Sequence, residues 1–180
     1  MNDDKLRQLL DDEAHDELVS AQSGTLIQQK QFDAALSVIL EIRQISERAF
    51  ALTNLLQVSN QHHVERSTFT KILDAILATV NALPCESDQA DLLRSAALIV
   101  RQNGDQSQAI KLLMDSVERA SVGETVNSAQ DATESAKTLY GIVADLISMD
   151  ELAVARHIAS SIRNPYYRNQ ATTLCSKNSL

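Results

Sequence analysis

The feature that most constrains this sequence is a helical pattern that recurs about every forty residues. Each copy reads as an apolar helix, a short turn and a second helix rich in Ala and Leu. The clearest copies span residues 32–57, 69–102, 109–147 and 152–174. A single helix hairpin cannot bury its own apolar face, so this period indicates hairpins stacked against one another. The sequence therefore predicts an all-α fold, either a short α-solenoid or an array of stacked antiparallel helix hairpins, with eight or nine helices.

Length and composition agree with this prediction. The chain has 180 residues, of which 44% are hydrophobic, and these values suit one domain with a sizeable core. It contains only four Gly and two Pro, too few for the frequent turns of an all-β fold. We expect a single helical-repeat domain over residues 1–180, with an acidic N-terminal helical segment at 1–30 and the repeats at 31–176.

Several helix boundaries follow from local signals. Gly104 is expected to close one helix in the left-handed conformation, and Asp105 to cap the next. Asn164 and Pro165 suit a cap and a first helical residue. Ser46-Glu47 is expected to open another helix. In the first helix we expect an apolar stripe with a break at residues 20–24, and we expect a loop at 121–128. The stripe consists of Leu6, Leu10, Ala14 and Leu18.

Two segments resemble a known kind of repeat. Residues 152–174 hold an Ala-rich helix followed by Ile-Arg-Asn-Pro-Tyr-Tyr-Arg-Asn-Gln-Ala, and Asn103-Gly104-Asp105 precedes a helix containing Ala109. Over residues 32–176 the pattern resembles degenerate tetratricopeptide-like repeats, and HEAT-like repeats have a similar period. The chain lacks the Trp of the full tetratricopeptide signature. The resemblance implies stacked hairpins that bind other proteins, and it assigns no binding residues.

Charge and motifs exclude several classes of function. The net charge of −8 disfavours nucleic-acid binding, and no apolar run is long enough to span a membrane. The four glycines are too far apart for a phosphate-binding loop, so we expect no cofactor. Cys85 and Cys175 show no disulfide framework, and no signal peptide is evident. A cytoplasmic location is the expectation.

Three clusters offer chemistry, and each has a simpler interpretation. Cys85 lies at an expected helix N-terminus, where the helix dipole would lower the thiol pKa, but an ordinary turn cysteine is the favoured reading. The segment at residues 11–16 offers metal ligands, but we favour a solvated acidic face. Its candidate ligands are Asp11, Asp12, His15 and Asp16. His62-His63 with Glu65 is interpreted as a polar connection. We expect no metal site.

The candidate partner-binding residues lie near the C-terminus. They are Arg156, Arg163, Tyr166, Tyr167 and Arg168. No acidic residue follows Glu151, so these side chains are expected to form a basic, aromatic rim. The rim would bind an acidic peptide or the acidic first helix of a neighbouring copy. The alternative is that Tyr167 covers the core and the arginines are simply solvated.

The sequence thus favours a non-enzymatic protein–protein interaction module with an unknown protein or peptide partner. One alternative is a helical ligand-binding or metal-binding domain, or an enzyme, that uses the acidic–His cluster or Cys85. A further alternative is a structural subunit that assembles with itself, acidic end to basic end.

Overall fold

The computed structural model describes residues 3–125 and 129–178, and over these residues the chain forms nine α-helices and no strand. The prediction of an all-α fold with eight or nine helices is confirmed. The helices group into two compact units, residues 1–82 (unit 1) and residues 83–180 (unit 2). The single domain expected over residues 1–180 stays a prediction, and each unit is described by itself.

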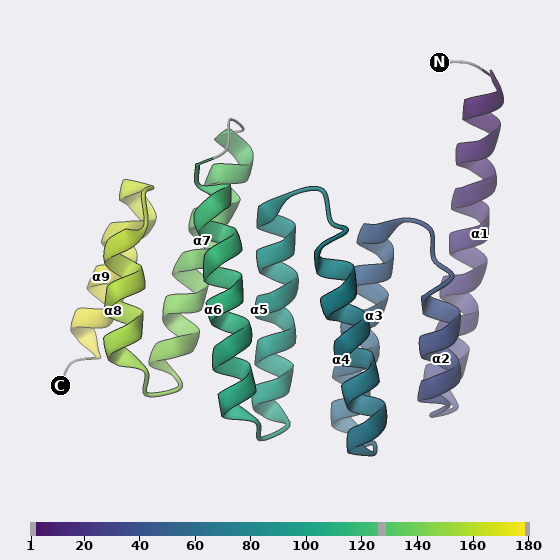
Figure 1. Cartoon of the computed structure of the whole chain (residues 1–180), viewed down its shortest axis with the longest axis horizontal. Coiled ribbons are helices and arrows are strands. Elements are labelled where there is room, and N and C mark those ends of the chain that lie inside the picture. The colour runs from purple at the N-terminus through teal and green to yellow at the C-terminus, as the bar shows by residue number, and fades with distance from the viewer. Residues whose placement is uncertain (1–2, 126–128, 179–180) are drawn as a thin grey trace. The chain divides into compact units, whose positions relative to one another are not determined.

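Unit 1 consists of two antiparallel helix hairpins (Figure 1). Its helices are α1 (Asp3–Gln28), α2 (Phe32–Ile39), α3 (Ile45–Gln61) and α4 (Arg66–Val80). The first helices of the hairpins, α1 and α3, contact each other, and so do the second helices, α2 and α4. The side chains between them are aliphatic and fully buried, among them Ile39, Leu52, Leu55, Ile72 and Ile76. Unit 1 therefore has two helical layers around one core.

Unit 2, taken by itself, consists of two helix hairpins and a final helix (Figure 1). Its helices are α5 (Glu86–Gln102), α6 (Gln106–Gly123), α7 (Ala129–Ile147), α8 (Leu152–Ser161) and α9 (Pro165–Lys177). Helix α7 contacts both α5 and α9, so the three lie in one layer. Leu113, Leu139, Ile142 and Leu146 form the centre of the core. No helix in the described ranges is long and apolar enough to cross a membrane.

The four hairpins share one kind of turn. In each, a residue with positive φ follows the first helix: Lys30 (60°), His63 (49°), Gly104 (92°) and Asp150 (63°). In the first hairpin, Lys30 N–H donates to the carbonyl of Ile27 and Gln31 N–H donates to that of Leu26, both at 2.9 Å. The other turns repeat these two hydrogen bonds, which define the Schellman motif. The left-handed Gly104 was predicted, whereas the other three turns use residues that rarely adopt this conformation.

Helix α1 differs from its prediction in two ways. It runs without a break from Asp3 to Gln28, so the interruption expected at residues 20–24 is wrong. The expected stripe is also wrong within the part whose side chains are described, because Leu18 is 69% exposed. The buried face instead consists of Asp16, Val19, Ser23 and Ile27. A buried carboxylate replaces an apolar residue on this face because it binds backbone N–H groups of the α2–α3 loop.

The expected caps are confirmed at two helix starts. Asp105 Oδ1 accepts a hydrogen bond from Gln108 N at 3.0 Å. Asn164 accepts from the N–H groups of Tyr166 and Tyr167, and Pro165 is the first residue of α9. Helix α3 instead begins at Ile45, and its N-cap residue Gln44 makes no side-chain cap, so the predicted cap and first turn at Ser46-Glu47 are two residues late. The loop expected at residues 121–128 is wrong at its start, because helix α6 continues to Gly123. Its last three residues, 126–128, lie outside the described ranges.

Candidate functional site

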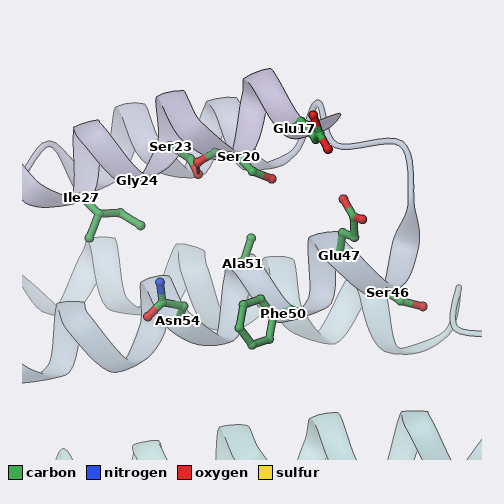
Figure 2. Close-up of a pocket in the computed structure, with 10 residues that line it drawn as sticks. All are labelled: Glu17, Ser20, Ser23, Gly24, Ile27, Ser46, Glu47, Phe50, Ala51 and Asn54. Carbon is green, nitrogen blue, oxygen red and sulfur yellow. Dashed lines mark hydrogen bonds between the residues drawn. The ribbon is translucent and has the colours of Figure 1, made fainter. Parts of the chain in front are cut away.

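A hollow of unit 1 lies between the parallel helices α1 and α3 (Figure 2). It has a volume of about 630 Å³, and we call it the α1–α3 groove. Both helices line the groove. Its lining residues are Glu17, Ser20, Ser23, Gly24 and Ile27 of α1, and Ser46, Glu47, Phe50, Ala51 and Asn54 of α3. Figure 2 shows the two glutamates at one end of the groove and Ile27 at the other.

Phe50 gives the groove its apolar character. The chain has three phenylalanines, and two of them, Phe32 and Phe69, are buried in the core. Phe50 is 77% exposed because it lies off the buried stripe of α3. Complete burial of such a ring contributes about 1.5–3 kcal/mol of free energy. An exposed aromatic ring beside a hollow is therefore a favourable contact for a partner.

Gly24 lines the α1 side of the groove without a side chain of its own. It lies inside a long helix, where Gly is about 1 kcal/mol less favourable than Ala. A Cβ built at this position meets no atom within 4 Å, so core packing does not require a glycine here. The groove thus has space that the fold itself does not use.

Two carboxylates define the polar end of the groove. Glu47 projects from α3 toward α1, where Glu17 lies (Figure 2). Both side chains are exposed, and within the described part of the chain neither forms a salt bridge. Two like charges on facing helices repel each other, so a cation placed between them lowers the electrostatic energy. The groove surface is therefore mostly apolar, and it is acidic at one end.

Asp16, next to Glu17 in sequence, holds α1 in place. Its carboxylate is completely buried and accepts hydrogen bonds from Arg43 N and Gln44 N, both at 2.8 Å. Burial raises the pKa of Asp16, but the two backbone donors together with the positive charges of His15 and Arg43 outweigh burial, so the pKa lies below its usual value. Because the bonded loop leads directly into α3, Asp16 sets the spacing of the two helices that line the groove.

This result corrects the prediction of a solvated acidic face at residues 11–16. Asp16 is buried, and Asp12 forms an ion pair with the Arg43 guanidinium. Across the described residues, no group of three or more His, Cys, Asp or Glu side chains is arranged to hold a metal ion. His62 and His63 lie exposed in the α3–α4 turn.

The two C-terminal tyrosines are in contact, and a third ring lies beside them. The rings of Tyr166 and Tyr167 are 5.1 Å apart in an edge-to-face arrangement, and Tyr140 of α7 lies 6.3 Å from Tyr167. A pocket of about 460 Å³ opens beside Tyr140 and Tyr166, and Lys177 also lines it. Tyr166 remains 63% exposed, whereas Tyr167 is half-buried.

The three predicted arginines are exposed, and one of them, Arg168, does not share a helix face with Tyr166. Arg168 follows Tyr166 by two positions, so on a helix the two side chains point in nearly opposite directions. Arg156 projects from α8, and Arg163 lies in the α8–α9 loop. The Glu124 carboxylate accepts hydrogen bonds from the backbone N–H groups of Arg163 and Asn164, so an acidic side chain lies within the expected basic rim.

Cys85 occupies the expected position at the start of a helix, and acidic side chains lie around it. It is the N-cap residue of α5 and lines a pocket of about 500 Å³ together with Asp88 and Asp131. Burial raises the pKa of the Cys85 thiol, and the carboxylates of Asp88, Asp131 and Glu86 raise it further. Burial and the surrounding negative charges therefore oppose the alternative of a thiol activated by the helix dipole, and an ordinary turn cysteine stays the favoured interpretation.

The described residues define an all-α protein of stacked helical hairpins with an apolar, acid-ended groove in unit 1. Comparison with protein-family models, curated proteins and solved structures found no match to this chain. Sequence reasoning missed the groove. Phe50 was the available signal, since it is a large aromatic residue outside the apolar stripe of its helix in a chain with only 3% aromatic residues.

Proposed function

We propose that this protein is a non-enzymatic interaction module whose α1–α3 groove binds a basic, amphipathic helical segment of a protein partner. The single observation that carries the proposal is Phe50, a ring 77% exposed beside a hollow of about 630 Å³. Stacked hairpins in each unit support the related proposal of tetratricopeptide-like or HEAT-like repeats, which bind partners on surfaces formed by successive helices.

The chemistry of the groove defines the complementary partner. Ile27, Phe50 and Ala51 suit an apolar stripe of the kind that an amphipathic helix presents every three or four residues. Glu17 and Glu47 suit a lysine or arginine at one end of that stripe. The net charge of −8 favours the approach of such a segment. The acidic partner predicted for the C-terminal arginines stays a separate prediction.

The proposal is tested by titrating the full chain into a short, labelled, designed peptide and following fluorescence anisotropy. The peptide forms an amphipathic helix with a leucine stripe and ends in lysines. Phe50→Ala removes a ring whose burial is worth about 2 kcal/mol, so we expect a roughly thirtyfold weaker Kd. Gly24→Trp fills the groove and is expected to abolish binding, while Gly24→Ala is its matched control.

Two outcomes refute the proposal. A scrambled peptide of the same composition that binds equally well shows that attraction between opposite charges is sufficient. Equal affinity of the wild type and Gly24→Trp shows that the peptide binds elsewhere. Circular dichroism of each variant confirms that it retains its helices.

A further inference from the structure

We infer that helix α9 of a second copy of this chain is a partner of the α1–α3 groove, so that copies associate from the groove of one to α9 of the next. This inference rests on the proposed function and names the occupant of the same site. It joins the acid-ended groove of unit 1 to an exposed, basic helix of unit 2.

Charge complementarity is the first argument. The sequence after Glu151 contains no acidic residue, and Lys177 lies on the same face of α9 as Tyr166. Over the described ranges the Lys177 side chain forms no salt bridge. The groove presents the two carboxylates of Glu17 and Glu47, which also lack such partners in that part of the chain. The two surfaces have opposite local charge although the chain as a whole is acidic.

The apolar contact is the second argument. Tyr166 is 63% exposed at the first turn of α9, and Phe50 is 77% exposed in the groove. Both are large aromatic side chains left largely in water. When α9 lies along the groove, both rings are removed from water, Phe50 beneath α9 and Tyr166 at the apolar end beside Ile27.

The spacing of the groups is the third argument. Lys177 lies eleven residues after Tyr166, or about three turns, so both side chains share one face of α9 about 16 Å apart. Along α1, Ile27 lies ten residues after Glu17, or about 15 Å. When α9 runs antiparallel to α1, Tyr166 reaches the apolar end of the groove and Lys177 reaches the two carboxylates.

The contact is heterologous, because a groove on one copy meets a different surface on the next. Each copy offers one groove and one α9, so association continues from copy to copy until a ring closes or an open chain forms. A single helix covers a small area, so the association is weak and depends on concentration. The ion pairs at one end make it weaker at high salt.

The experiment is sedimentation velocity of the full chain from about 10 µM to about 1 mM, a range suited to weak interfaces. We expect the wild type to sediment faster as concentration rises, and less so at high salt. Two variants are expected to stay monomeric alone: Gly24→Trp, with a filled groove, and Tyr166→Ala combined with Lys177→Glu, with an altered α9. If the loss of the Tyr166 ring disturbs α9, the single variant Lys177→Glu replaces the double variant, because Lys177 is exposed.

Mixing the two variants provides the decisive measurement. The Gly24→Trp chain still has an intact α9, and the α9 variant still has an open groove, so the mixture is expected to form dimers and nothing larger. A wild type that stays monomeric at about 1 mM overturns the inference. So does a mixture that stays monomeric, or a variant that associates as the wild type does. If the designed peptide binds the groove while the wild type stays monomeric, only the inference fails and the proposed function stands.

Discussion

Asp16 provides the sharpest test of how unit 1 is held together. Its buried carboxylate accepts two charge-assisted hydrogen bonds of 2.8 Å from the backbone of the α2–α3 loop. Hydrogen bonds to charged groups contribute about 1.5–3 kcal/mol each. These two are only partly buried at the donor side, so we take the lower value and expect Asp16→Ala to cost about 3 kcal/mol of unfolding free energy. Urea denaturation at pH 7, followed by circular dichroism, measures this difference.

Asp12→Ala is the matched control, because Asp12 lies one turn earlier on α1 and pairs with the side chain of Arg43. That pair is solvent-exposed, so its loss is expected to cost less than about 1 kcal/mol. The folded-state pKa of Asp16 lies below its unfolded value. Its stabilisation is therefore complete above the unfolded pKa and is lost as pH falls through the folded pKa. Equal losses for the two variants at pH 7, or an unchanged acid sensitivity in Asp16→Ala, refute the reasoning.

Three further predictions concern single residues. Gly24→Ala is expected to stabilise unit 1 by up to about 1 kcal/mol in urea denaturation, because the added Cβ meets no atom and the helix gains propensity. Lys30→Gly is expected to stabilise it by about 0.5–1 kcal/mol in the same assay, because Lys30 has a φ of 60° that glycine adopts without strain; a loss of stability contradicts this. The third variant is Cys175→Ser, which leaves Cys85 as the one cysteine of the chain. Cys85 is expected to react with a disulfide reagent more slowly than a small free thiol does, and the pH at which its reaction rate is half-maximal is expected to lie above that of such a thiol. The reason is that burial and neighbouring carboxylates raise the pKa of Cys85.

Local signals predicted the helices well, because a helix is specified by residues within a few positions of one another. The turn at Gly104, the cap at Asp105 and the start of α9 at Asn164 all depend on neighbouring residues. The left-handed turns at Lys30 and His63 could not be predicted, since their conformation is imposed by packing of the hairpin and not by the residue type. Sequence periodicity thus predicts the hairpins, but it does not predict the strained left-handed residues in their turns.

Contacts between distant residues explain what sequence reasoning missed. Asp16 binds backbone groups at positions 43 and 44, Glu124 binds those at 163 and 164, and Asp131 accepts from Ser87 N. Each carboxylate accepts hydrogen bonds from backbone N–H groups at or just before the start of a helix. In many helices a capping side chain next to the helix start accepts such bonds instead. An acidic residue used in this way looks the same in sequence as a solvated one. The expected acidic face on α1 was wrong for this reason.

The same argument explains why α1 supports both the fold and the proposed binding site. Asp16 and Glu17 are consecutive and about 100° apart around the helix, so one carboxylate is directed into unit 1 while the next lines the groove. The buried carboxylate fixes the loop that begins α3, and α3 carries Phe50 and Glu47. Loss of Asp16 is therefore expected to weaken peptide binding as well as stability, although Asp16 does not line the groove. An Asp16→Ala chain that remains folded but binds the designed peptide with unchanged affinity would show that the spacing of α1 and α3 does not depend on this residue.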